Sequence, residues 1–156
     1  MQFIDYTKCS SIESIEREIS AMSGKRLITP EQAESVSAKK ILDFFNSPLG
    51  KRVLNADNVY REFKYSILAP GELIDTEWAQ EQILFQGVVD CCIEERGELT
   101  IIDFKTDIVT EKTVDGRAME YQPQLMAYEY AVERIMGKKA AEKYLYFFHT
   151  GTAVKL

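Results

Sequence analysis

Hydrophobic positions in the first third of the chain recur at the spacing of amphipathic helices. The first apolar face ends at Gly24 and consists of Ile12, Ile15, Ile19 and Met22. Thr29-Pro30 has the pattern of a second helix start, with proline at the first helical position. Segments of about 38–45 and about 48–54 predict two further short helices, joined at Asn46-Ser47. We therefore expect residues 1–56 to form a helical region.

After this region the pattern changes to β-branched and aromatic runs separated by turn residues. Residues 59–67 predict a strand that ends before a turn at Pro70-Gly71, and 83–93 with 99–104 predict an antiparallel hairpin turning at Arg96-Gly97. A polar loop is expected from about 108 to 116, followed by a helix that ends at Gly137. Its apolar stripe is Leu125, Tyr128, Val132 and Ile135. The last elements are predicted strands at 143–148 and 152–154. This order predicts an α/β fold in which helices flank a mixed sheet.

Length and composition limit the organisation of the chain. With 156 residues, of which 46% are hydrophobic, the chain is long enough for one core and too short for two, so we expect a single domain over 1–156. Within it, 57–156 would form the core that contains the sheet. No run of about 18 apolar residues and no signal peptide is visible, which favours a cytoplasmic protein without membrane contact.

The cysteines argue against a disulfide-bonded or cysteine-ligated metal protein, and the net charge argues against an autonomous DNA-binding protein. Three cysteines, two of them adjacent at Cys91 and Cys92, form neither a disulfide framework nor a Cys-x-x-Cys metal site, and small buried side chains are expected there. The formal net charge of −6 argues against a protein that binds DNA by its own electrostatic field. We expect the chain alone to bind DNA weakly.

Candidate chemistry lies in the predicted hairpin, where Asp90 and Asp103 interrupt apolar strands. If the turn is centred on Arg96-Gly97, Asp90 faces Asp103 directly, and the two-residue period puts Lys105 on the same face. Two carboxylates so close repel each other, and a divalent cation such as Mg²⁺ or Mn²⁺ would remove the conflict. The lysine would then orient or activate a water, or stabilise charge on a phosphate oxygen. The alternative is an Asp/Lys ion pair on a solvated sheet face.

At these residues the chain resembles the RecB-like PD-(D/E)xK nucleases, which have a restriction-endonuclease-like fold. The resemblance rests on Gly87-x-x-Asp90, on Asp103-Phe104-Lys105-Thr106, and on Tyr121-x-x-Gln124-Leu-x-x-Tyr128. It implies that 57–156 is the catalytic core. Within this core, Asp90, Asp103 and the Phe104 carbonyl would hold the metal, and Lys105 would position or activate water. It further implies that Gln124, Tyr128, Tyr121 and Thr106 contact DNA or support the lysine. For Tyr128, an ordinary core position is an equal alternative.

Two more segments extend the resemblance over nearly the whole chain. Arg61-Glu62-Phe63 is similar to the strand before the catalytic hairpin in the large chains of helicase-nucleases, with Glu62 as a tentative metal-site residue. Residues 1–31 resemble the carboxyl-terminal part of the A subunit of bacterial AddAB-type ATP-dependent helicase/nucleases. In that family a third ligand, a histidine, precedes the segment that begins here. We therefore expect this chain, by itself, to bind metal weakly and to cleave DNA poorly.

The resemblance also implies the wider context. The expected function is a Mg²⁺-dependent DNA exonuclease domain within a helicase-nuclease that processes double-strand DNA ends for recombinational repair. Its partners would be DNA, the helicase domains of the parent chain, which alone would use ATP, and a second, B-type subunit. No iron–sulfur cluster is expected because its cysteines are lacking. A catalytically silent module that binds the partner subunit or DNA is the alternative, and a free-standing nuclease of the CRISPR-adaptation type is a third reading.

Overall fold

The computed structural model describes residues 1–73, 76–78 and 80–156. After a 3₁₀ turn at Tyr6–Lys8, four helices form the amino-terminal third, as predicted: α1 (Ile12–Gly24), α2 (Pro30–Ser35), α3 (Ala38–Asn46) and α4 (Pro48–Asn55). Each begins at a Ser or Thr whose side chain accepts a backbone N–H of the first turn, from Ser11, Thr29, Ser37 and Ser47 in turn. Local capping therefore fixes where each short helix starts.

The remaining chain builds a five-stranded mixed sheet in the order β1-β2-β3-β4-β5. The strands are β1 (Asn58–Pro70), β2 (Gln82–Glu95), β3 (Glu98–Lys105), β4 (Ala140–Phe147) and β5 (Thr152–Lys155). Only β3 and β4 are parallel, and α5 (Val114–Glu120) and α6 (Gln122–Met136) connect them. Helix α6 ends at Gly137, which has the left-handed φ of 65° typical of such a cap. The predicted α/β architecture is confirmed.

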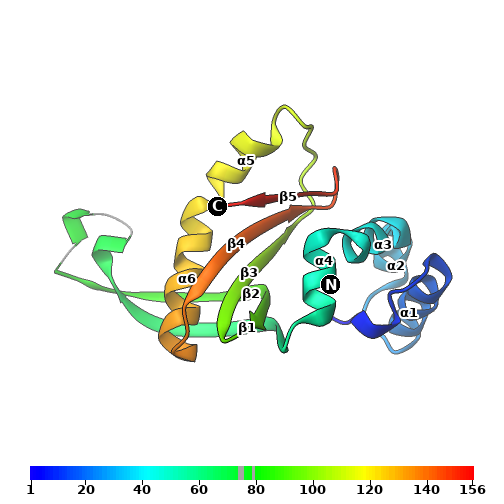
Figure 1. Ribbon diagram of the computed structural model, residues 1–156, viewed down its shortest axis with the longest axis horizontal. Helices are drawn as coiled ribbons and strands as arrows, with labels where there is room; N and C mark the ends of the chain where they lie inside the picture. The colour runs from blue at the N-terminus through cyan, green and yellow to red at the C-terminus, as the bar shows by residue number, and fades with distance from the viewer. Residues whose placement is uncertain (74–75, 79) are drawn as a thin grey trace.

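Two elements differ from the predicted pattern. Residues 114–116, expected in a loop, begin helix α5, because Val114 and Ala118 lie one turn apart and are both buried in the core. The hairpin of β1 and β2 is also longer than predicted. Since β2 pairs with β3 only from Cys91 to Glu95, the distal half of this hairpin projects from the body as a two-stranded arm (Figure 1).

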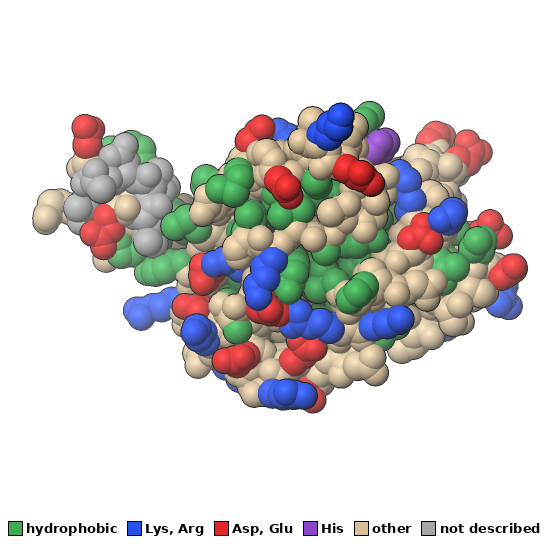
Figure 2. Space-filling model, turned by 45° about the horizontal axis from the view of Figure 1, so that its top comes forward, with side chains coloured by type: hydrophobic (Ala, Val, Ile, Leu, Met, Phe, Trp, Pro, Cys, Tyr) green, Lys and Arg blue, Asp and Glu red, His purple; other side chains and the backbone are tan. Residues whose placement is uncertain are grey.

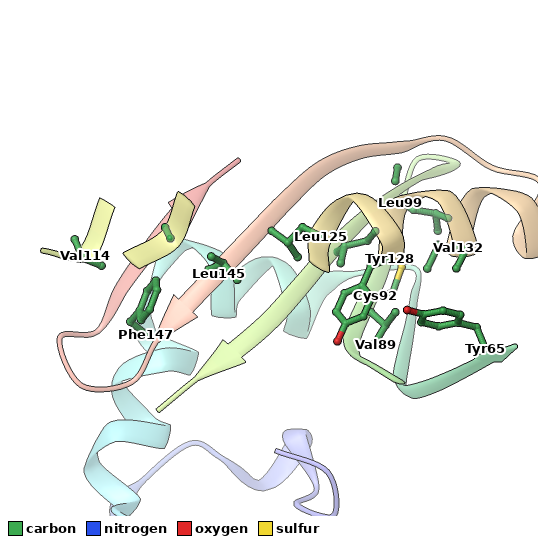
Figure 3. Packing of buried hydrophobic residues seen from close by; sticks show 14 of the residues in the cluster. Tyr65, Val89, Cys92, Leu99, Val114, Leu125, Tyr128, Val132, Leu145 and Phe147 are labelled. Atoms are coloured by element: carbon green, nitrogen blue, oxygen red, sulfur yellow. The ribbon is translucent and has the colours of Figure 1, made fainter. Parts of the chain in front are cut away.

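Helices cover the two faces of the sheet with separate apolar clusters. Helix α6 covers one face, where Leu125, Tyr128 and Val132 pack over the strands (Figure 3). The predicted stripe is right for these three residues and wrong for Ile135, which is 46% exposed past the edge of the cluster. The amino-terminal helices pack on the other face, with Phe44 against Tyr146 and Phe104. Within the described part of the chain, no helix is long and apolar enough to cross a membrane.

The cysteines and the surface agree with their expected character. Cys91 and Cys92 are fully buried, pack into opposite apolar clusters, and burial raises the pKa of both thiols to about 12. Neither is therefore a thiolate nucleophile. Figure 2 shows acidic and basic side chains interspersed over the visible face, without a continuous basic band.

Candidate active site

The hairpin of β2 and β3 has the predicted register. Pairs such as Cys91↔Ile102 and Glu95↔Glu98 place the turn at Arg96-Gly97, and the next position after Cys91↔Ile102 brings Asp90 to the level of Asp103. Main-chain pairing between the strands stops there. The Asp90 side chain takes its place, because its Oδ2 accepts a hydrogen bond of 2.9 Å from the Phe104 N–H. Asp90 is thus fixed against the strand segment that carries Asp103 and Lys105.

The neighbouring strand β1 is distorted at the same level. Glu62 has a φ of 50°, and the strand pairing passes from Arg61↔Cys91 to Phe63↔Val89 without Glu62 and Asp90. A glutamate in this left-handed region costs on the order of 1–3 kcal/mol, and such strain clusters at functional sites. The simple two-residue alternation assumed along the hairpin fails here, because Val89 and Cys92 contact the same core cluster. The regular pairing of β1 with β2 is thus interrupted at Asp90.

Lys105 is held by three groups on two elements. Its Nζ lies 2.7 Å from Asp103 Oδ2 and donates to Gln124 Oε1 over 2.8 Å. It also lies 3.6 Å from the centre of the Tyr121 ring, a cation–π contact. The lysine side chain is only 12% exposed, so its position is fixed from both the strand and helix α6.

One face of α6 supplies these contacts, as the spacing of Tyr121, Gln124 and Tyr128 predicted. Gln124 Nε2 donates to the Tyr128 hydroxyl over 2.6 Å, which fixes the amide so that its oxygen points at Lys105. Tyr128 itself is 6% exposed and packs edge-on against Tyr65, with ring centres 6.0 Å apart. Both interpretations of Tyr128 therefore apply, since its ring belongs to the core and its hydroxyl supports Gln124.

Gly87, the first residue of the Gly-x-x-Asp90 motif, makes this packing possible. Tyr65 pairs with Gly87 across the hairpin, and a Cβ on residue 87 would lie 2.6 Å from the Tyr65 hydroxyl oxygen. Without a side chain at 87, the Tyr65 ring crosses the strand and reaches Tyr128. The glycine of the motif thus acts through Tyr65 on the helix that holds Lys105.

Asp103 is the most buried charged group of the site, at 2% exposure. Burial raises the pKa of its carboxyl, the Lys105 ammonium lowers it in part, and the Asp90 charge raises it again. Lys105 Nζ is close to Oδ2 but poorly directed toward it, so this buried oxygen has an ion pair and no hydrogen bond of good geometry among the described residues. Such an atom has an unfilled place for a partner.

A divalent cation fits this donor set. Asp103 Oδ2 lacks a directed donor, the Asp90 carboxylate has one oxygen bonded to Phe104, and both groups are oxygen ligands of the kind Mg²⁺ prefers. Among the described residues no group of three His, Cys, Asp or Glu side chains has metal-site geometry. Glu62 is therefore not gathered with the two aspartates into a three-residue site.

Asp107 and Arg117 join the site, which the sequence did not predict. The Tyr121 hydroxyl donates to Asp107 Oδ1 over 2.9 Å, and Arg117 Nε donates to the same oxygen over 2.8 Å. Arg117 lowers the pKa of the Asp107 carboxyl. Arg117 is thus part of the support of the Tyr121 ring. The i, i+4 spacing of Arg117 and Tyr121 on a helix could have predicted that their side chains meet. The contact of Arg117 with Asp107 could not be predicted in this way, because it depends on how the chain folds between β3 and α5.

We call Lys105 and the residues that hold it, Asp103, Gln124 and Tyr121, the lysine cluster. Thr106 lies apart from this cluster and from the hairpin carboxylates. It is exposed just after β3 and lines a cleft with Lys40 and His149, on the amino-terminal side of the site. The predicted residues therefore divide between the lysine cluster, the hairpin carboxylates and this cleft.

Comparison with known proteins agrees with this geometry. A model of the PD-(D/E)XK nuclease superfamily matches residues 13–155. The A subunit of the ATP-dependent helicase/nuclease of Clostridium acetobutylicum is 37% identical over 163 residues, covering 100% of this chain and 13% of the relative. The protein of the same name from Acetivibrio thermocellus is 40% identical over 156 residues, covering 97% of this chain and 12% of the relative.

The chain thus spans about an eighth of the length of these curated relatives. The family model covers nearly all of the sheet and the helices that position Asp90, Asp103 and Lys105. On this evidence the chain belongs to the PD-(D/E)XK nuclease superfamily.

Proposed function

We propose that this nuclease domain is a Mg²⁺-dependent DNA exonuclease that hydrolyses phosphodiester bonds. The observation that carries the proposal is the immobilised Lys105 ammonium, 2.7 Å from Asp103 and hydrogen-bonded to Gln124, beside a second carboxylate at Asp90. A surface ion pair on a solvated face would not be buried to this degree or held from two elements. The intact set of three charged residues also supports this proposal over a silent module that only binds a partner chain or DNA.

Asp90, Asp103 and the Phe104 carbonyl would hold the cation. When bound, Mg²⁺ or Mn²⁺ supplies neutralisation of charge on the phosphate and lowers the pKa of a coordinated water. Burial holds the Asp103 carboxylate in place for this cation, and the hydrogen bond from the Phe104 N–H holds the Asp90 carboxylate. The two aspartates thus have a binding role, and the proton chemistry falls to Lys105.

Lys105 keeps N–H donors that can take part in the reaction. An ammonium has three donors, of which one bonds Gln124, while the charge of the ammonium is paired with Asp103 without a directed hydrogen bond. An N–H that does not bond Gln124 can orient the attacking water or donate to a non-bridging phosphate oxygen as negative charge grows there. Gln124 and the Tyr121 ring prevent the side chain from swinging away. Hydrolysis then needs the water in line with the leaving oxygen.

The names of the relatives suggest the setting of this activity. As part of a helicase/nuclease, the domain would receive a DNA strand from helicase domains of the same parent chain and would work beside a second, B-type chain in the bacterial cytoplasm. The mixed surface charge and the net charge of −6 support delivery of DNA by other parts of the assembly. Processing of double-strand ends for recombinational repair is the pathway that we propose.

The experiment is a cleavage assay with end-labelled single- and double-stranded DNA, with Mg²⁺, with Mn²⁺ and with chelator. It is carried out on this chain and on a longer helicase/nuclease polypeptide that contains it. Lys105→Ala should lower the rate of metal-dependent cleavage by about 10²–10⁴-fold. Lys64→Ala, on the exposed outer side of the β1–β2 hairpin, serves as the control and should leave the rate unchanged. Cleavage that persists in Lys105→Ala would refute the proposed mechanism.

A further inference from the structure

A cleft beside the lysine cluster has the residues of a nucleotide subsite. It has a volume of about 370 Å³ and lies where the α2–α3 junction, the end of β3 and the β4–β5 turn meet. Its lining includes Ser37, Lys40, Thr106, Phe148 and His149. We refer to this feature as the Lys40 cleft.

The Lys40 cleft is continuous with the catalytic strand. Thr106 directly follows Lys105, and the N–H of Phe148 donates to the Lys105 carbonyl oxygen over 2.9 Å. The Phe148 ring lies 5.6 Å from the ring of Phe104, the residue whose N–H holds Asp90. Thr106 is three residues from Asp103, about 10 Å along an extended chain, so a DNA strand with its scissile phosphate at Asp90 and Asp103 can extend to this cleft.

The polar groups of the cleft are donors. Lys40 is exposed and forms no ion pair with any described residue, whereas its neighbour Lys39 is neutralised by Asp43 at 2.6 Å. Ser37 accepts the Lys40 N–H through its hydroxyl oxygen, which leaves the hydroxyl hydrogen free to donate. Thr106 supplies a second hydroxyl, and His149 is exposed on the β4–β5 turn. The one histidine of the chain is visible at the surface in Figure 2 (purple).

Acidic side chains of the described residues do not line this cleft. The chain has 25 Asp and Glu residues, yet none lines the Lys40 cleft in the part of the chain that the structure describes. The pocket around Arg52 differs, because it is lined by Glu95, Glu98 and Glu142, and its arginine pairs with Glu95 and Glu142. At Lys40, by contrast, a cation without an ion pair to any described residue meets several neutral donors, which is the composition that suits a phosphate.

We propose that the Lys40 cleft binds the phosphate of the DNA nucleotide adjacent to the bond that is cut. Lys40, Ser37 and Thr106 donate to the phosphate oxygens, His149 closes the outer side, and the half-buried Phe148 ring offers a face to the sugar or base. The helical amino-terminal third thereby becomes part of the substrate site, through the start of α3. The inference rests on the proposed DNA nuclease function.

The test is a titration of the ¹⁵N-labelled chain with the single-stranded tetranucleotide dT₄, in chelator so that no cleavage occurs. The changes in backbone amide chemical shift on addition of dT₄ should be largest at residues 37–40, 106 and 148–149. Lys40→Ala should weaken binding several-fold and reduce the slope of log affinity against log salt by about 0.7, the share of one phosphate contact on a single strand. Lys40→Arg should restore most of the slope. Lys39→Ala, one position away on the same helix, should behave as the unchanged chain.

The outcomes separate this inference from the proposed function. Binding without shifts at the cleft, no detectable binding at millimolar dT₄, or equal losses in Lys39→Ala and Lys40→Ala would each overturn the subsite. Cleft shifts that also occur in Asp90→Asn support the subsite whatever the cleavage assay gives. Failure of metal-dependent cleavage in the longer polypeptide would remove the nuclease function and leave the binding result in place.

Discussion

Replacing the buried Asp103 with asparagine should stabilise the fold at neutral pH. The carboxyl is 2% exposed, and its Oδ2 has no well-directed hydrogen bond among the described residues. Burial raises the pKa of this group despite the Lys105 ammonium nearby, so ionisation of Asp103 opposes folding. An asparagine of the same shape carries no charge to desolvate. Lys105 would keep its hydrogen bond to Gln124 and its contact with the Tyr121 ring.

The size of the effect follows from linkage. Each unit by which folding raises the pKa of an acid costs about 1.4 kcal/mol at a pH above both values. Loss of the Asp103–Lys105 ion pair works in the other direction, so the net gain for Asp103→Asn is expected at about 1 kcal/mol, within the range of about 0.5–2 kcal/mol for single stabilising substitutions. This corresponds to about 2–4 °C in Tm for a domain of this size.

The sign of the pH dependence is specific. A raised folded-state pKa contributes stability that is fully present below the unfolded pKa, about 3.9, and is lost as the pH rises through the folded value. The gain from Asp103→Asn should therefore vanish near pH 4 and be complete at pH 7.5. Asp107→Asn is the matched control with the opposite sign, because Arg117 lowers the pKa of Asp107 and the variant should lose stability at neutral pH.

The assay is urea unfolding at pH 4, 5.5 and 7.5 for the unchanged chain and both variants, with and without Mg²⁺. Added Mg²⁺ should stabilise the unchanged chain and have less effect on Asp103→Asn, since a ligand that binds only the folded state adds stability. A variant less stable than the unchanged chain at pH 7.5, by an amount that does not depend on pH, would refute the reasoning. It would mean that the ion pair to Lys105 outweighs the desolvation of Asp103.

Two more substitutions test the support of the lysine. Gly87→Ala should lower the free energy of unfolding, measured with urea, by about 1–3 kcal/mol, because its Cβ would lie 2.6 Å from the Tyr65 hydroxyl oxygen. The control is Gly116→Ala, at an exposed position of helix α5 where a Cβ would have nothing within 4 Å. It should raise the free energy of unfolding by about 0.5–1 kcal/mol. Equal effects at 87 and 116 would contradict the role given to Tyr65. Tyr121→Leu removes the ring 3.6 Å from Lys105 and should lower kcat about tenfold with little change in KM, whereas Tyr121→Phe keeps the ring and should retain most of kcat. Equal loss of kcat in both would point to the hydroxyl and its bond to Asp107 instead.

Some features of this protein follow from the order of residues alone. Helix starts at Thr29-Pro30 and Ser37 are local, because each capping hydroxyl accepts an N–H three positions along the chain. The cap at Gly137 and the hairpin turn at Arg96-Gly97 are local, because glycine readily adopts the positive φ that both positions have. Once the turn is fixed, the period of the strands sets the level of Asp90 and Asp103. The face of α6 that carries Gln124 follows from helical spacing in the same way.

Contacts between segments distant in sequence were decided by the tertiary structure. The left-handed Glu62 on β1 interrupts the alternation at Asp90, and no pattern along β2 announces it. Asp107 meets Tyr121 only because the β3–α5 connection folds back over the sheet, and Lys40 joins Thr106 only because α3 packs beside the end of β3. The sequence by itself determines which groups are available and how each element presents them. Which of them meet depends on how the elements pack, because burial and long-range contacts involve residues that no local pattern relates.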